Sequence, residues 1–199
     1  MLIFLGCDAG TSDNMALAAI HPNGDIAVAL CGNTKPAEAR DRAAGAATEI
    51  SRAFSRLLIP RNMAAVLALE WQCSRPNDPR PDNIIDLSAF VGIALATIQV
   101  RMGSAPLEVF LPTPDEWKGN VPKHVKQNRI VAMAGKDVVE SALVSARIPV
   151  PKNLGQFKDT SSAMASDAID AIGLAQWARA RASLRNTVRS ALAKPAPEL

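Results

Sequence analysis

Four acidic residues stand beside apolar stretches of the sequence, where a carboxylate is costly unless something compensates its charge. Asp8 ends the first apolar run of the chain, and Glu70 ends another near the middle. Asp167 and Asp170 are three residues apart in a segment rich in Ala, Ile and Leu, so a helix would place them on one face. Carboxylates gathered in one place repel each other and hold protons. A pair of divalent cations would remove that repulsion.

These acids suit the chemistry of phosphodiester hydrolysis. Hard oxygen ligands favour Mg²⁺ or Mn²⁺, and two such ions about 4 Å apart can activate a water and stabilise the leaving oxygen. If the two apolar runs are neighbouring strands, their carboxyl ends lie together, and a helix packed across that edge would add the other two acids. Each acid also has a structural interpretation. Asp8 could begin a turn, and Asp167 could be a first-turn acid favoured by the helix dipole.

The rest of the pattern predicts the elements that would hold these acids. Bounded apolar runs predict five strands, at Leu2–Cys7, Met15–Ile20, Ile26–Leu30, Met63–Leu69 and Leu107–Leu111. Apolar periodicity and composition predict helices over Ala37–Leu58, Asp82–Met102 and Asp137–Ala146, with two more that start near Lys123 and Ser161. This order predicts an α/β fold, in which a three-strand antiparallel meander and parallel strands form a mixed five-stranded sheet flanked by helices.

Length and composition indicate one domain with a real core, since the 199 residues are 48% hydrophobic. We expect one folded domain, the candidate nuclease, over residues 1–182 and a basic C-terminal tail over residues 183–199. The net charge of +3 permits an anionic partner without requiring one. No run has the roughly 18 apolar residues that a membrane span needs, and we interpret the apolar N-terminal run as a strand rather than a signal peptide. Three widely spaced cysteines indicate neither disulfides nor zinc, which favours a reducing cytoplasm.

The motifs around the acids resemble those of the RuvC family of Holliday-junction resolvases, within the RNase H-like superfamily, over residues 2–180. "LGCDAGTS" is similar to the family's first-strand motif, "AVLALEWQ" to its fourth-strand motif and "SDAIDAIGLAQW" to the motif of its last helix. "AFVGIAL", and "VFLPTPDEWKG" followed by "KHVKQNRIV", are similar to further family segments. The resemblance implies an RNase H-like sheet and a crossover-junction endodeoxyribonuclease that acts on four-way junctions or related branched DNA. It also implies two Mg²⁺ or Mn²⁺ ions per active site, held by Asp8, Glu70, Asp167 and Asp170.

Basic residues in the segment that resembles the family's DNA-facing helix are candidate DNA contacts. They are Lys118, Lys123, His124 and Lys126. We expect Lys126 to be catalytic, because an ammonium at the scissile phosphate would stabilise charge in the transition state. Lys123 could equally belong to a solvated helix face.

Further along the chain, Arg75 and Arg80 follow Glu70 in a loop rich in Pro and Arg, where they could hold phosphates. This loop departs from the family pattern, because Cys73 stands where an aromatic wedge is expected and Trp71 is differently phased. The length and these departures suggest a phage-type or otherwise remote member of the family, and the resemblance thus implies the cytoplasm of a bacterium or of a phage-infected host. Basic residues near the C-terminus could form an electrostatic arm on DNA or simply a soluble tail.

The helix predicted over Asp82–Met102 is apolar almost all round, so its outer side must also be covered. Another helix of the same chain could cover it, whereas the family resemblance implies a homodimer formed through this helix. We interpret Trp117 and Trp177 as packing residues rather than base stackers.

Three other functions share parts of this pattern. An RNase H-like nuclease acting on flaps, forks or RNA–DNA hybrids would use the same acids, because the metal chemistry is shared. A non-catalytic DNA-binding relative would not need all four acids. An actin-like or sugar-kinase ATPase has a similar first motif, but it would need a second domain and a second Gly-rich phosphate loop that this sequence lacks.

Overall fold

The computed structural model describes residues 1–8, 15–32, 39–60, 62–71, 81–158 and 163–192 of the chain. The strands are β1 (Leu2–Asp8), β2 (Met15–Ile20), β3 (Ile26–Cys31), β4 (Ala64–Leu69) and β5 (Leu107–Phe110). The helices are α1 (Ala39–Arg56), α2 (Pro81–Met102), α3 (Pro114–Lys118), α4 (Lys123–Ala134), α5 (Lys136–Ser145) and α6 (Ala163–Leu192).

The five strands form one mixed sheet in the order β3-β2-β1-β4-β5. β1, β2 and β3 form an antiparallel meander, and β4 and β5 add to β1 as parallel strands. The tight turn between β2 and β3 is closed by the backbone N–H of His21, which donates to the carbonyl of Asp25 at 2.9 Å. The predicted α/β class and the mixed five-stranded sheet are therefore confirmed.

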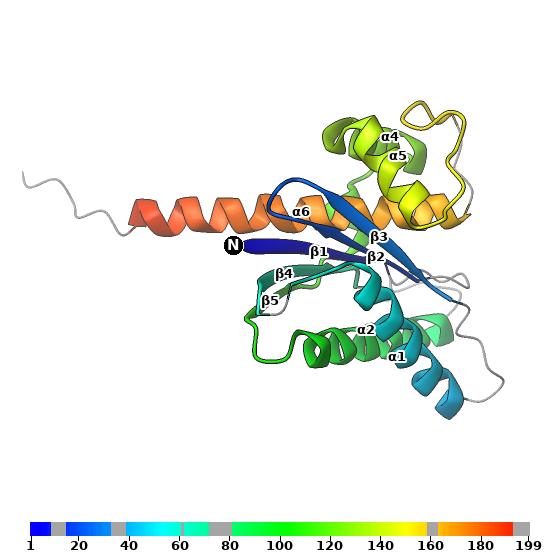
Figure 1. Ribbon diagram of the computed structural model, residues 1–199, viewed down its shortest axis with the longest axis vertical. Coiled ribbons are helices and arrows are strands. Elements are labelled where there is room, and N and C mark those ends of the chain that lie inside the picture. The colour runs from blue at the N-terminus through cyan, green and yellow to red at the C-terminus, as the bar shows by residue number, and fades with distance from the viewer. Residues whose placement is uncertain (9–14, 33–38, 61, 72–80, 159–162, 193–199) are drawn as a thin grey trace, which may run out of the picture.

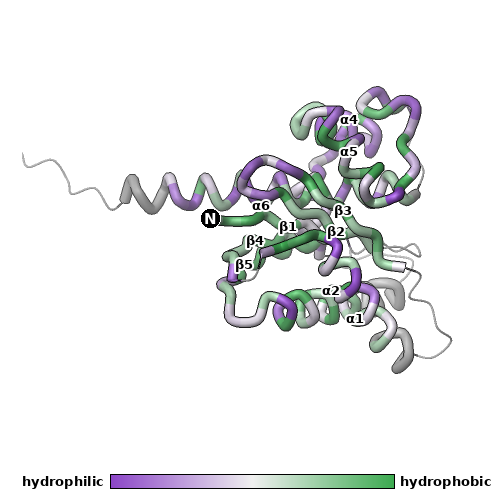
Figure 2. The backbone as a smooth tube through the Cα atoms, in the orientation of Figure 1, coloured by the Kyte–Doolittle hydropathy of each residue, from purple (hydrophilic) through white to green (hydrophobic). Residues whose placement is uncertain are grey.

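Helices cover both faces of the sheet. α1 and α2 lie on one face, whereas α6 crosses the other with α4 and α5 beside it (Figure 1). Because both faces are covered, the inner strands β1, β2 and β4 carry nearly continuous apolar runs rather than alternating polar and apolar residues (Figure 2). Ile3, Leu5 and Leu67 face the layer of α1 and α2, while Ala16, Ala18 and Val28 face the layer of α6. None of the helices among the described residues is long and apolar enough to cross a lipid bilayer.

α6 approaches β1 closely because Gly6 has no side chain. A Cβ atom at Gly6 would lie 2.0 Å from the carbonyl oxygen of Ala171 and 2.5 Å from the backbone nitrogen of Ala175. No larger residue fits there without moving the helix away from the sheet. This contact fixes the first turns of α6, which carry Asp167 and Asp170, over the end of β1.

Two elements differ from the sequence prediction. The five-residue α3 occupies a segment predicted as loop. α6 continues to Leu192, so residues 183–192 of the predicted basic tail are helical. Arg185, in this extension, forms an ion pair with Glu108 on β5, and Ala182 is buried. The first ten residues of the predicted tail therefore continue α6, where good helix formers and this contact with the sheet favour the helix.

Candidate active site

Asp8 and Glu70 lie side by side at the ends of two parallel strands. β1 and β4 pair in a register that places Cys7 opposite Leu69, so the next residue on each strand is an acid. The backbone N–H of Glu70 donates to the carbonyl of Cys7 at 3.2 Å, which continues the pairing to the acids themselves. Both carboxylates are buried, with 5% of Asp8 and 3% of Glu70 exposed.

The first turns of α6 bring Asp167 and Asp170 to the same edge of the sheet. Both are buried, and the small residues between and beside them, such as Ala168 and Ala171, are fully buried too. The Asp8 carboxyl interacts electrostatically with Glu70, Asp170 and Asp167. The structure thus brings together the four acids that the sequence singles out.

The carboxylates carry more negative charge than their surroundings compensate. Burial, and then the charges of Glu70 and Asp170, raise the pKa of Asp8 to about 8. Burial raises the pKa of Asp167 to about 6, against the opposing charge of Lys123 and with a contribution from Asp170. Oδ2 of Asp167 is buried and accepts no hydrogen bond from the described residues. In the absence of cations the Asp8 carboxyl, with its pKa of about 8, holds a proton at neutral pH, whereas Asp167, with its pKa of about 6, holds one only in mildly acidic solution.

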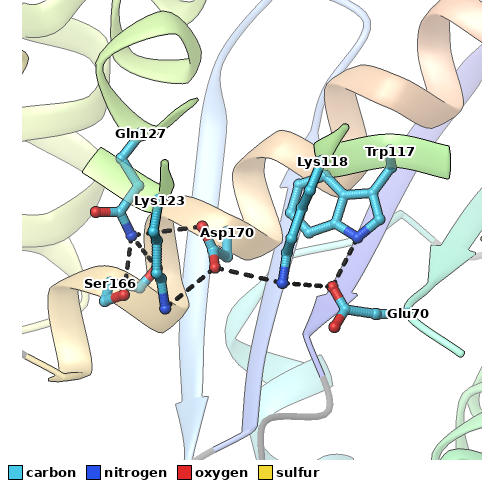
Figure 3. Close-up of polar contacts among 7 residues, drawn as sticks. All are labelled: Glu70, Trp117, Lys118, Lys123, Gln127, Ser166 and Asp170. Atoms are coloured by element: carbon cyan, nitrogen blue, oxygen red, sulfur yellow. Dashed lines mark hydrogen bonds and ion pairs between the residues drawn. The ribbon is translucent and has the colours of Figure 1, made fainter. Parts of the chain in front are cut away.

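Two ammonium groups contact the acids directly (Figure 3). Nζ of Lys118 lies 2.7 Å from Oε2 of Glu70 and 3.8 Å from Oδ2 of Asp170. Nζ of Lys123 lies 3.4 Å from the same Asp170 oxygen. Burial lowers the pKa of Lys118, but the carboxylates of Glu70, Asp8 and Asp170 raise it by more, so the net shift is upward and this ammonium stays charged.

Lys126 has a different environment from the one we predicted for it. Its side chain is buried, and its ammonium has no hydrogen-bond partner among the described residues. Nζ lies over the ring of Trp117, 2.8 Å from the ring centroid. Burial lowers its pKa to about 7. That Lys126 contacts the scissile phosphate stays a prediction, and the contacts with carboxylates belong to Lys118 and Lys123.

Of the other predicted DNA-binding residues, one lies on α4 and two lie outside the described residues. His124 is half-buried on α4, next to Lys123. Arg75 and Arg80 lie outside the described residues, as does Cys73.

Sequence reasoning missed two polar contacts to the acids. The indole N–H of Trp117 donates to Oε2 of Glu70 at 2.6 Å, so this residue is more than the packing residue that we predicted. The fully buried Gln127 donates from Nε2 to Oγ of Ser166 at 2.8 Å and to Oδ1 of Asp170 at 3.4 Å (Figure 3). Gln127 follows Lys123 by four residues on one helix, a spacing that would have placed both on the face toward the acids.

The donor set suits divalent cations in its chemistry and position. Carboxylate oxygens are the ligands that Mg²⁺ and Mn²⁺ prefer, and the buried, unpartnered oxygen of Asp167 lies among them. Within the described ranges, however, no three acidic, histidine or cysteine side chains converge closely enough to hold a metal ion. Lys118 instead bridges Glu70 and Asp170. To bind such an ion, the acids would have to turn their side chains toward a shared centre, and this ammonium would have to move aside.

The fold has a counterpart among solved structures. The crystal structure of the yeast mitochondrial Holliday junction resolvase Ydc2 matches with a TM-score of 0.50 and 13% identity, over 94% of this chain and 82% of that one. The chain has an RNase H-like fold. The fold implied by the sequence motifs is therefore confirmed.

Two structures of RuvC from Thermus thermophilus are also similar in outline. One has a TM-score of 0.44 and 21% identity, over 91% of this chain and 96% of that one. The other, in complex with a Holliday junction substrate, has a TM-score of 0.42 and 19% identity, over 90% and 96%. No protein-family model matches the sequence. No curated protein matches it either.

Proposed function

We propose that this RNase H-like chain is a metal-dependent DNA endonuclease that resolves four-way junctions or related branched DNA by paired phosphodiester hydrolysis. The observation that carries the proposal is the meeting of four buried carboxylates from β1, β4 and α6 at one edge of the sheet. Carboxylates gathered in one place repel each other unless cations compensate their charge, and the resemblance of the sequence motifs implies a metal pair held by these four acids. The likeness to Ydc2 supports the fold on which the proposal rests.

Asp8, Glu70, Asp167 and Asp170 would hold two Mg²⁺ or Mn²⁺ ions. When bound, these ions would activate a water and stabilise the leaving oxygen of the scissile phosphodiester. The high pKa of Asp8 means that its proton must leave before it becomes a ligand, so cation binding releases protons.

The protein's own cations would act on the DNA. In the metal-free site Lys118 neutralises Glu70 and Asp170, and its side chain is 26% exposed at the surface of the cluster. Once cations take over that neutralisation, Lys118 and Lys123 become free to contact phosphate oxygens. The proposed DNA-binding set is therefore Lys118, Lys123, His124 and Lys126, with Arg75 and Arg80 retained from the sequence.

A homodimer would supply the second cut that junction resolution needs. α1 packs along one flank of α2 and takes part of the cover that its apolar surface requires. The outer side of α2 still exposes small and apolar residues, at Ala89, Gly92, Ala96 and Val100. Val100 is 79% exposed, and nothing lies within 4 Å of a Cβ atom placed at Gly92. A second copy of α2 could approach this stripe closely, and a twofold axis there would direct two sites to two DNA strands.

Cleavage of a substrate panel tests the proposal. Labelled four-way junctions, forks, flaps, linear duplexes and RNA–DNA hybrids are incubated with the protein in Mn²⁺ or in EDTA. Preferential, cation-dependent cutting of the junction is expected. Preferential cutting of flaps or hybrids would instead assign the same acids to the alternative nuclease function.

A further inference from the structure

The Trp117 side chain contacts both Glu70 and Lys126. Its indole N–H donates to Oε2 of Glu70 at 2.6 Å, and the ammonium of Lys126 lies 2.8 Å from its ring centroid. Glu70 follows β4, Trp117 belongs to α3 and Lys126 to α4. The indole is thus the point at which three elements meet beside the acids.

The indole is fixed in place by its packing. A Cβ atom at Gly173 of α6 would lie 3.0 Å from Cζ3 of Trp117 and 2.5 Å from Cδ1 of Ile130, so the glycine leaves room for both side chains. The start of α3 is fixed as well, because the Glu116 carboxylate accepts a hydrogen bond from the Thr113 backbone N–H at 2.7 Å. The position of the ring therefore depends on the fold rather than on its contact with Glu70.

The contact with Lys126 is costly unless the ring compensates it. A buried ammonium without a hydrogen-bond partner is strongly unfavourable, whereas an aromatic face attracts a desolvated cation and offsets part of that cost. The contact therefore stabilises the buried Lys126 ammonium only while the Trp117 ring stays in its present position. Rotation of the indole away from Glu70 would leave Lys126 without this contact.

Trp117 and Lys118 both donate to the same Glu70 oxygen, but the two donors differ. The Lys118 ammonium is at the end of a flexible, partly exposed side chain and carries a charge that an incoming cation would replace. The indole is neutral, rigid and held by α4 and α6. Metal entry can therefore displace Lys118 while the hydrogen bond from Trp117 remains.

We propose that Trp117 is a positioning residue, which fixes the orientation of the Glu70 carboxylate for cation binding, and that Lys126 holds the indole in that position. The inference rests on the proposed function to the extent that Glu70 is a metal ligand. Residues that hydrogen-bond a metal ligand commonly change metal affinity or activity by about 10- to 100-fold when they are replaced.

The first test compares how substitutions at two tryptophans change the affinity for Mn²⁺. The affinity is measured from the electron paramagnetic resonance signal of free Mn²⁺. Trp117→Phe keeps an aromatic face for Lys126 but removes the N–H donor, and it should weaken Mn²⁺ binding about 10- to 100-fold. Trp177→Phe is the matched control, because that indole packs edge-to-face on Phe110, away from the acids. It should bind Mn²⁺ as the wild type does.

A second variant separates the hydrogen bond from packing. In a Trp71→Phe, Trp177→Phe background, Trp117 is the only tryptophan of the three. Replacing it biosynthetically with benzothienylalanine keeps the shape and the ring face and removes only the N–H. This protein should fold, with an unchanged melting temperature in EDTA, and should still lose Mn²⁺ affinity. In the same background, Mg²⁺ should change the Trp117 emission, and Glu70→Gln should abolish that change.

The outcomes distinguish this inference from the proposed function. Wild-type Mn²⁺ affinity in both Trp117→Phe and the benzothienylalanine protein would overturn it and leave Trp117 as a packing residue. If the wild type cuts no DNA but these proteins still lose Mn²⁺ affinity, the positioning role stands and the nuclease function fails. For an active enzyme, Trp117→Phe should lower kcat at saturating junction while the Kd for junction DNA stays unchanged.

Discussion

Lys118 places its ammonium nitrogen 2.7 Å from Oε2 of Glu70, and the same nitrogen reaches Asp170 at 3.8 Å. One lysine thus joins a strand-borne acid to a helix-borne acid in the metal-free site. A divalent cation bound by these acids would have to displace it. Binding of a cation would therefore also release Lys118 to contact DNA.

Replacing an acid should remove cleavage while leaving DNA binding largely intact. Asp8→Asn and Glu70→Gln each remove a proposed ligand at adjacent strand ends, so the junction cleavage rate in Mg²⁺ should fall by at least about 100-fold. A mobility-shift assay in Ca²⁺ should show junction affinity within a few-fold of the wild type. Asp137→Asn, an exposed acid on α5, is the matched control. Near-normal cleavage by either acid variant would remove that residue from the metal site.

The metal-free protein should lose stability as the pH rises between about 4 and about 7, because above pH 7 the lowered pKa of Lys126 acts in the opposite direction. The pKa of Asp8 is raised from 3.8 to about 8 in the folded protein, and that of Asp167 to about 6. The folded state therefore keeps protons that the unfolded chain has released. This contribution is fully present below pH 3.8 and is lost as the pH rises through the folded pKa values. One retained proton corresponds to about 1.4 kcal/mol per pH unit, or a melting-temperature change of a few degrees.

Thermal melts in EDTA across this pH range measure the effect. Mg²⁺ or Mn²⁺ should raise the melting temperature most strongly at the upper end of this pH range, where the carboxylates are deprotonated and repel each other most. Asp8→Asn should flatten the pH dependence, because its amide does not titrate. A wild-type melting temperature that rises steadily with pH in EDTA would contradict the charge balance described for this cluster.

The three lysines near the acids should differ in their effects. Lys118→Met and Lys123→Met remove the ammonium groups that contact Glu70 and Asp170. The rate of cleavage at saturating junction DNA should fall in both variants, by about 100-fold in the more strongly affected one. Lys126→Met should lower the rate less and should weaken Mn²⁺ binding, since its ammonium contacts Trp117. Single-turnover kinetics with excess protein measures the rates. A greater rate loss for Lys126→Met, with unchanged Mn²⁺ affinity, would return the phosphate-binding role to Lys126.

The exposed stripe on α2 should form the dimer contact. Light scattering at micromolar concentration should give twice the chain mass of 21.1 kDa. Ala96→Glu places a charge in the middle of the stripe and should give the monomer mass, whereas Val144→Glu, at a site 60% exposed on α5, should not. A wild-type mass of 21.1 kDa that is unchanged by junction DNA would exclude the dimer. A flap or hybrid nuclease would then be the better account.

The positions of the acids were predictable because they depend on simple patterns. An apolar run that stops at an acid marks a strand end, and Asp167 and Asp170 share a helix face by their spacing alone. The parallel pairing of β1 with β4 then places Asp8 beside Glu70. Gly6 is part of the same logic, although its role becomes visible only when α6 lies against it.

The directions of the side chains around the acids were not predictable. α3 has only five residues, too few for any periodicity to show, so nothing in the sequence directs the Trp117 indole toward Glu70. Lys123 and Lys126 are three residues apart on α4, yet one reaches Asp170 and the other turns to the Trp117 ring. The directions of these two lysine side chains depend on the position of the indole, which is set by tertiary packing. The helical extension through Arg185 likewise depends on an ion pair with a distant strand.

The central claim is that these four acids cut branched DNA in pairs with the help of divalent cations. The most direct measurement is single-turnover cleavage of a synthetic four-way junction in Mn²⁺, with each strand labelled in turn. We expect nicks at symmetric positions in two opposite strands, ligatable duplex products, and no products in EDTA or with Asp8→Asn. Cleavage that persists with Asp8→Asn, or the absence of any cation-dependent nick in the wild type, would contradict the account.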